Sequence, residues 1–170
     1  MNRFEGGLRK LLVAQLSELL FCEHQLTLAL EVMAQAAHHD ALKAVFHTHK
    51  VETEGHVERL GECFAELKEI PRQLPCRATE GLVEDMSRLI DVMGADPVFD
   101  HALVAAAQRV EMFEISSYRT VVKLASSIGQ CKIAEIARDI LHEEERANEE
   151  LTQALTSPGR TKGKVHVRGS

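Results

Sequence analysis

The sequence predicts an all-α protein, an antiparallel four-helix bundle with a long crossover that contains a short helix. Alanine, leucine and glutamate are abundant, whereas the chain has one Tyr, no Trp, four Pro and ten Gly, which favours helix over sheet. Apolar residues also recur at steps of three and four along four long segments. With 170 residues and 45% hydrophobic content, the chain is long enough for one domain with a core and too short for two.

The first two long helices are predicted to form a hairpin. One helical pattern covers residues 8–37, after Gly6-Gly7, and a second covers residues 40–68, before Ile70-Pro71. His38-His39-Asp40 breaks the pattern between them, and Asp40 is a suitable N-cap for the second helix. Because the connection is so short, these helices are expected to be antiparallel neighbours.

The long helical pattern is interrupted between Pro71 and Pro97. The stretch PRQLPCRA is predicted to be an extended loop. Thr79 is then predicted to cap a shorter amphipathic helix, EGLVEDMSRLIDVM, which stops at Gly94. We interpret this segment as a crossover and not as a member of the bundle.

The last two long helices are predicted to form a second hairpin. Asp96-Pro97 begins the third long helix, because an N-cap followed by proline at the first helical position is a preferred order. This helix is expected to end at Ile128, where Gly129 is a left-handed stop, and the fourth is expected to run from Gln130 to about Thr156. Two long hairpins joined by a long crossover form the arrangement of ferritin-like bundles. We therefore expect one bundle domain over residues 1–156.

Charge and targeting patterns narrow the class of protein. The formal net charge of −6 provides no basic stripe for a phosphate backbone, so we expect no nucleic-acid partner and a better match to cations. Residues 157–170 are basic and rich in Gly, and are expected to form a disordered C-terminal tail. Neither a secretory pattern nor an apolar run of about 18 residues is present, and the four cysteines form no CxxC pair. We therefore expect a cytoplasmic protein with reduced thiols and no membrane partner.

Each of the four long segments carries an acid in the middle of its apolar stripe. The first stripe has leucines on both sides of its acid, and the second has a polar middle with apolar ends. Helices of similar length that pack side by side bring their midpoints to one level, and each midpoint lies within about one turn of a stripe acid. The acids expected to converge are Glu23, Glu52, Glu114 and Glu144.

Converging carboxylates in an apolar bundle need a counter-charge, because they repel one another and lose hydration. No Lys or Arg occupies the stripe positions, so a bound metal is the simplest counter-charge, and four glutamates would neutralise two divalent ions. Carboxylates with an imidazole suit iron or manganese, and zinc is a less selective alternative. Glu111 and His56 are the best additional ligands, since each lies one turn from a stripe acid. The predicted metal ligands are Glu23, Glu52, His56, Glu111, Glu114 and Glu144.

Each of these polar residues also has an interpretation that does not require a metal. Each acid taken singly is better explained as solvated or as part of a polar layer, and the convergence of four is what favours a metal. His49 is either a ligand or outer donor or a histidine at the core edge. Glu143 is expected to be solvated or to support a ligand. Tyr118 is expected to be a packed aromatic, a hydrogen-bond donor to a carboxylate or an electron carrier. The histidines expected at the surface are His24, His38, His39, His47, His101 and His142.

Five stretches together resemble the ferritin-like proteins of the YciE/YciF type, which are described as a domain of unknown function. They are LLFCEHQL, HKVETEGHVERL, CRATEGL, AAAQRVEMFEISSYRTV and LHEEERANEEL, and the resemblance covers about residues 8–156. It implies a ferritin-like four-helix bundle with a dinuclear metal centre, a homodimer and an association with bacterial stress responses. No enzymatic reaction is established for this family.

The sequence departs from the ferritin-like template in its ligand spacing. The template places Glu-x-x-His on two helices, but here Gly55 stands three residues after Glu52, and His56 stands four residues after it. Relatives of this type often have a histidine at the position of Met112 and an aspartate at that of Asn148. These differences leave fewer ligands for a second metal position.

Three functions are compatible with these features. The first is a di-iron or di-manganese carboxylate protein that reacts with oxygen or peroxide at open coordination positions. The second is a metal-binding or structural stress protein without turnover, of which iron storage in a closed multi-subunit shell is a narrower version. The third is an all-α interaction module without a metal. The sequence does not choose between the first two.

Overall fold

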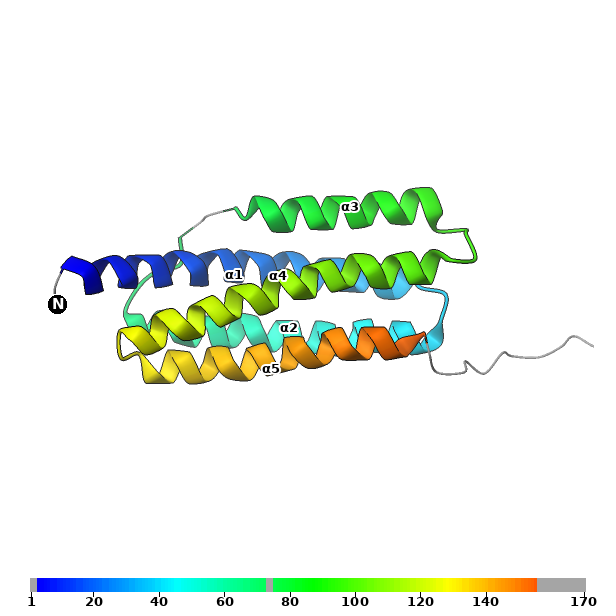
Figure 1. The fold of residues 1–170 in the computed structure, drawn as a ribbon. Helices are drawn as coiled ribbons and strands as arrows, with labels where there is room; N and C mark the ends of the chain where they lie inside the picture. The colour runs from blue at the N-terminus through cyan, green and yellow to red at the C-terminus, as the bar shows by residue number, and fades with distance from the viewer. Residues whose placement is uncertain (1–2, 73–74, 156–170) are drawn as a thin grey trace, which may run out of the picture.

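Four long helices form an antiparallel bundle, and a shorter helix packs on its outside (Figure 1). This computed structural model describes residues 3–72 and 75–155, which contain no strand. The helices are α1 (Arg3–Ala36), α2 (Asp40–Leu67), α3 (Arg77–Met93), α4 (Phe99–Ser127) and α5 (Cys131–Ala154). The prediction of an all-α fold is confirmed.

The order of the helices places two hairpins face to face. α1 pairs with α2 and α4 pairs with α5, and the hairpins meet where α1 packs on α4 and α2 packs on α5. α3 packs on α4 and α1 outside this bundle, as expected of a crossover helix, and it begins beside the middle of α1 (Figure 1). Within the described part of the chain, no helix is long and apolar enough to cross a membrane.

Two helices end in the left-handed turn that satisfies their last carbonyl groups. Gly129, with a φ of 71°, follows α4 as predicted, and its N–H donates to the Ser126 carbonyl at 3.2 Å. The Gln130 N–H donates to the Ala125 carbonyl at 2.9 Å, which completes the motif. α2 ends in the same way at Lys68, a non-glycine residue with a φ of 53°.

The first helix begins earlier than the sequence predicts. α1 starts at Arg3 and continues through Gly6-Gly7, although the two glycines favour a start after them. A glycine inside a helix costs about 1 kcal/mol relative to alanine. Adding residues to a helix that is already formed does not incur the nucleation cost again, so the glycines are tolerated. At the other end, α5 stops at Ala154, and the predicted tail 157–170 lies outside the described residues.

Asp40 is not the N-cap of α2 that the sequence predicts, and a residue of another helix holds the turn before α2. His39 holds the N-cap position without a side-chain cap, and Asp40 is already in the first turn. The Asp100 carboxylate of α4 accepts hydrogen bonds from the His38 and His39 N–H groups at 2.8 and 2.7 Å. A residue distant in sequence therefore fixes the turn between α1 and α2.

The predicted caps of the next two helices also lie elsewhere. Thr79 is buried inside the first turn of α3, which has Cys76 at its N-cap position. α4 begins at Phe99, and the Asp96 carboxylate accepts a hydrogen bond from the Val98 N–H at 2.9 Å in the preceding turn. Asp96 thus organises the turn before the helix and not its N-cap.

The core consists of two apolar clusters at different levels of the bundle. The cluster toward the α4–α5 turn and the cluster toward the α1–α2 turn each draw on all four long helices. Their large members include Leu16, Leu60, Val121 and Ile140 in the first and Leu30, Phe46, Leu103 and Leu151 in the second. Buried polar residues occupy the level between them.

Candidate metal centre

A polar layer separates the two apolar clusters at the middle of the bundle. Every member has a relative exposure of 4% or less, and each of the four long helices contributes. The members are Glu23 from α1, His49, Thr53 and His56 from α2, Glu111 and Glu114 from α4, and Glu144 from α5.

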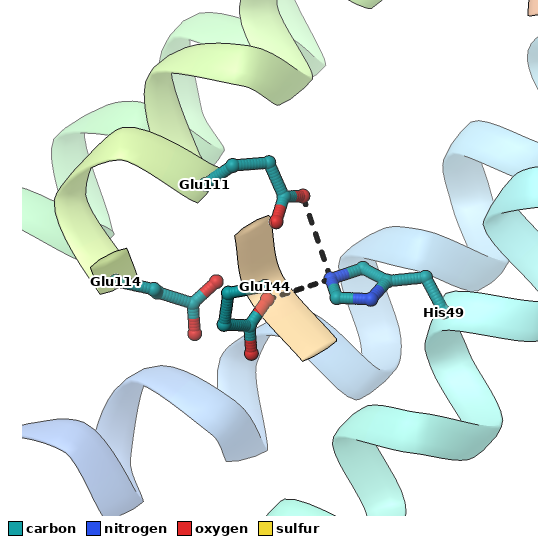
Figure 2. Close-up of side chains that lie close together, drawn as sticks. All are labelled: His49, Glu111, Glu114 and Glu144. Carbon is teal, nitrogen blue, oxygen red and sulfur yellow. Dashed lines mark ion pairs between the residues drawn. The ribbon is translucent and has the colours of Figure 1, made fainter. Parts of the chain in front are cut away.

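The first group of candidate ligands consists of His49, Glu111, Glu114 and Glu144. Figure 2 shows that these side chains point toward one another from three helices. One ligand atom from each lies within 4.8 Å of the others, and His49 Nε2 lies 3.4 Å from both Glu111 Oε1 and Glu144 Oε2. This spacing is compatible with one metal ion held by carboxylates and an imidazole.

The second group consists of Glu23, His56 and Glu144. His56 Nδ1 lies 2.8 Å from Glu144 Oε1 and 3.3 Å from Glu23 Oε2. Glu144 belongs to both groups, with one carboxylate oxygen toward His56 and the other toward His49. A carboxylate in this position is suited to bridge two ions.

Several carboxylate oxygens in the layer have no hydrogen-bond partner within the described part of the chain. These are Glu111 Oε2, Glu114 Oε2 and both oxygens of Glu144. The two Glu144 oxygens lie near the imidazoles of His49 and His56 without the alignment of a hydrogen bond. Leaving a buried polar group unsatisfied costs about 1–3 kcal/mol, and more for a charged group. Unsatisfied oxygen atoms on neighbouring acids, beside two imidazoles, fit a bound cation.

Without a cation, protons neutralise the acids of this layer. Burial is the main cause that raises the pKa of Glu23, Glu111 and Glu114, and the pKa of Glu111 reaches about 8. Burial also acts on Glu144, but the contact with His56 and the charge of His49 outweigh it and lower its pKa. Glu144 is therefore the carboxylate that stays ionised most readily.

The two imidazoles supply the positive charge around Glu144. Burial lowers the pKa of His49, but Glu111, with support from Glu52 and Glu144, raises it to about 9. Burial opposes protonation of His56 as well, and contacts with Glu144 and Glu23 raise its pKa to about 10. The metal-free layer thus resembles a compensated network, with cationic imidazoles on both sides of one carboxylate.

The His56 ring is held from its outer side by an ion pair. His56 Nε2 lies 2.9 Å from Glu143 Oε2, and Arg59 Nη1 donates to Glu143 Oε1 at 3.2 Å. With Nδ1 facing the acids and Nε2 on Glu143, the ring orientation is fixed from both sides. A supporting role for Glu143 is one of the two roles that the sequence predicts for it. Arg59 is not predicted from the sequence, because it lies off the apolar stripe and no local pattern indicates its contact with Glu143.

Tyr118 makes a second supporting contact. Its side chain is fully buried, and its O–H donates to Glu23 Oε1. Of the interpretations that the sequence allows for this tyrosine, the structure contains two, because Tyr118 is both a packed core aromatic and a hydrogen-bond donor to a carboxylate.

Five of the six predicted ligands lie in the two groups, and Glu52 does not. The Glu52 carboxylate is partly exposed, pairs with Arg146 of α5, and has Oε2 3.7 Å from His49 Nδ1. His49 and Glu52 are about 60° apart around the helix axis, so their stripe positions cannot be separated by periodicity alone. Because His49 and His56 fall almost in line along α2, the imidazoles face the core and Glu52 lies at its flank.

The remaining sequence expectations concern residues around the layer. All six histidines expected at the surface are exposed. Met112 is 53% exposed, so the methionine at this position does not displace a ligand from the layer. Asn148 follows Glu144 by one turn and has a buried Oδ1 without a hydrogen-bond partner among the residues that the structure describes.

Comparisons with known proteins are consistent with this architecture. The model of a family described as a domain of unknown function, DUF892, matches residues 7–162. Protein YciF of Escherichia coli (strain K12) is 37% identical over 138 residues, which are 81% of this chain and 83% of that protein.

Several solved structures resemble this protein along most of its length. The crystal structure of the E. coli stress protein YciF has a TM-score of 0.84 at 33% identity, covering 88% of this chain and 98% of that one. YcfI from Rhodopseudomonas palustris, described as a candidate structural protein, has a TM-score of 0.82 at 32% identity, covering 85% and 92%. A bacterioferritin-related protein from Bacteroides fragilis, described as a dodecameric thioferritin, has a TM-score of 0.67 at 20% identity, covering 87% and 86%. This last likeness shows a ferritin-like fold.

We predict that the metal-free protein loses stability as the pH rises from about 5 to about 9. Glu111 has an ordinary pKa of 4.5 and a folded value of about 8, and His49 has an ordinary value of 6.5 and a folded value of about 9. The folded state therefore binds more protons than the unfolded state in this window, so raising the pH favours unfolding. Urea unfolding of chelator-treated protein measures the effect. Glu111→Gln should flatten the curve, and stability that increases with pH in this window would contradict the prediction.

Proposed function

The chain belongs to the DUF892 family of YciF-type proteins, and we propose that it is a metal-binding protein whose polar layer holds two iron or manganese ions. The observation that carries this proposal is that two groups of buried histidine and glutamate ligands share Glu144. The four carboxylates of the two groups would balance the charge of two divalent cations, and unsatisfied carboxylate oxygens are available to bind them.

The proposed ligand set follows the two groups. His49, Glu111 and Glu114 would hold one ion, Glu23 and His56 the other, and Glu144 would bridge them. This donor set suits iron or manganese, with zinc as a less selective alternative. Glu52 lies on the Nδ1 side of the His49 ring and leaves Nε2 facing the acids, so we assign it a supporting role.

We further propose that the centre reacts with oxygen or peroxide in a cytoplasmic stress response. Two bound iron or manganese ions would supply the redox chemistry. The chain excludes water by burying every ligand, and it orients Glu23 through Tyr118 and His56 through Glu143. The similarity to YciF, which is named a stress protein, supports the physiological context.

A non-enzymatic structural role is the second candidate, and the electrostatics of the layer favour it specifically. The raised pKa values of the imidazoles and of Glu111 let protons balance the charges without a metal. A bundle neutralised in this way would fold without a metal and serve as a structural or interaction protein. The similarity to YcfI, described as a candidate structural protein, supports this alternative.

We propose a homodimer as the assembly. Apolar side chains exposed near the start of α1, Phe4 at 73% and Leu11 at 48%, offer a surface that a second copy would cover. Light scattering distinguishes a dimer from the closed shell that iron storage would need.

Metal uptake is the first test of the function. Protein purified without chelator, or loaded with iron or manganese, should contain about two ions per chain and melt at a higher temperature than the metal-free form, because binding only the folded state stabilises it. Glu144→Gln should remove the bridging charge and most of this stabilisation. Glu145→Gln is the matched control, since Glu145 is an exposed neighbour paired with Arg119. Equal metal content in both variants would contradict the ligand assignment.

A second prediction tests whether His49 or Glu52 is the metal ligand on α2. His49→Leu should reduce the bound metal toward one ion per chain, because it removes the imidazole of the first group. Glu52→Gln should retain about two ions per chain, since its carboxylate lies outside both groups. Elemental analysis and melting curves of the two variants decide the matter. Metal loss in Glu52→Gln with full occupancy in His49→Leu would reverse the assignment.

Turnover is tested by peroxide consumption. The metal-loaded protein should consume hydrogen peroxide faster than the metal-free protein and faster than loaded Glu144→Gln, because the shared carboxylate is needed to hold both ions. Metal content must be measured on the same samples. A loaded protein that leaves peroxide untouched would remove the enzymatic proposal and favour the structural one.

A further inference from the structure

The two hairpins meet along two seams, and only one of them is covered by another helix. α3 packs over the seam between α1 and α4. The seam between α2 and α5 lies on the opposite side of the bundle, where no helix of the described residues covers it (Figure 1). Because every member of the polar layer is buried, a cation needs a path to it, and this uncovered seam is the first place to look for one.

Both imidazoles of the layer meet a partly exposed acid at this seam. His56 Nε2 lies 2.9 Å from Glu143 Oε2, and His49 Nδ1 lies 3.7 Å from Glu52 Oε2. The side chains of Glu143 and Glu52 are 26% and 24% exposed. Each imidazole therefore stands between the buried acids on one side and an acid in contact with solvent on the other.

Two ion pairs of opposite direction join the helices across the seam. Arg59 of α2 pairs with Glu143 of α5, and Arg146 of α5 pairs with Glu52 of α2. A guanidinium group occupies carboxylate oxygens that a metal cation would otherwise bind. The two arginines thus control access to the two outer acids.

The two ends of the seam differ in how completely the acid is engaged. Arg59 donates to both oxygens of Glu143, and its side chain is 27% exposed. Arg146 donates to Oε1 of Glu52 only, and its side chain is 49% exposed. His49 Nδ1 is buried without a hydrogen-bond partner among the described residues, and its distance to Glu52 Oε2 is too long for a hydrogen bond. The Glu52 end therefore leaves two donor atoms facing each other without a bond.

This spacing is suitable for a cation between the two atoms. Donor atoms that each lie about 2.1 Å from one ion are at most about 4.2 Å apart. The 3.7 Å between His49 Nδ1 and Glu52 Oε2 falls within that limit. A carboxylate oxygen with an imidazole nitrogen is also the kind of donor pair that the polar layer itself offers.

We propose that divalent cations enter the polar layer through the α2–α5 seam at the Glu52 end, where Glu52 and His49 Nδ1 bind the cation in transit and Arg146 is the gate. The inference rests on the proposed function, because it supplies the path by which the ions reach their ligands. Release of Arg146 into solvent frees the Glu52 carboxylate to bind the incoming ion. Arg59 and Glu143 keep the other end of the seam closed.

The chain contains its own reporter of cation entry. Tyr118 is the one tyrosine of a chain without tryptophan, and its O–H donates to Glu23 in the polar layer. Mixing metal-free protein with excess manganese(II) in a stopped-flow instrument should change the tyrosine fluorescence at a rate that measures entry. Elemental analysis of the same samples after the reaction gives the final metal content.

The variants separate the gate from the transit ligand. Arg146→Gln should raise the rate of manganese entry by about threefold, because it frees Glu52, and Glu52→Gln should lower the rate by about as much. Both variants should still bind the metal content of the wild type, since neither residue belongs to a ligand group. Arg119→Gln is the matched control, because Arg119 pairs with Glu145 of α5 from α4, and its rate should equal that of the wild type.

Three results would overturn the proposal, and they are distinguishable. Equal entry rates in the wild type, Arg146→Gln and Glu52→Gln, at full metal content, would overturn the route and leave the metal centre intact. The same acceleration in Arg119→Gln as in Arg146→Gln would assign the effect to general loosening of α5 and overturn the gate. A wild-type protein that binds no manganese or iron would overturn the metal centre and the route together, and elemental analysis identifies this result without any rate.

Discussion

The burial of four carboxylates at one level of the bundle is the constraint on which the rest of the structure depends. Removing charged groups from water costs several kcal/mol each unless they are compensated. The apolar clusters above and below, each drawing on all four long helices, provide the stability that carries this cost. Compensation then comes from two imidazoles and from protons on the acids, or from cations that replace those protons. The bundle is therefore a scaffold whose middle layer must be neutralised, either by protons or by cations.

The candidate ligands are distributed unevenly over the helices, and this differs from the symmetric ferritin-like template. In the template, two helices each carry Glu-x-x-His. Here α2 supplies both imidazoles, because His49 and His56 stand seven residues apart and face the same side after about two turns. α4 supplies two acids, and α5 supplies the carboxylate that both groups share. One histidine-bearing helix thus replaces two, which explains why the template spacing is absent from the sequence.

Much of the fold and part of the site follow from periodicity, and the remainder depends on contacts between distant residues. Leucines spaced by three and four predict the long helices, and the acids at their midpoints predict where the polar layer lies. The choice between His49 and Glu52 rests on a difference of about 60° around one helix, which a stripe does not resolve. Arg59 on Glu143 and Asp100 at the α1–α2 turn are long-range pairs that no local pattern signals.

The crossover helix is packed against the bundle more closely than a simple connection requires. A connection that merely joined two hairpins could cross at either end of the bundle. α3 instead begins beside the middle of α1, and Thr79 in its first turn is fully buried (Figure 1). Cys22 of α1 lies beside the polar layer, with its Sγ 3.7 Å from Glu114 Oε1. The first turn of the crossover helix is thus part of the buried interior and is more than a connection between two hairpins.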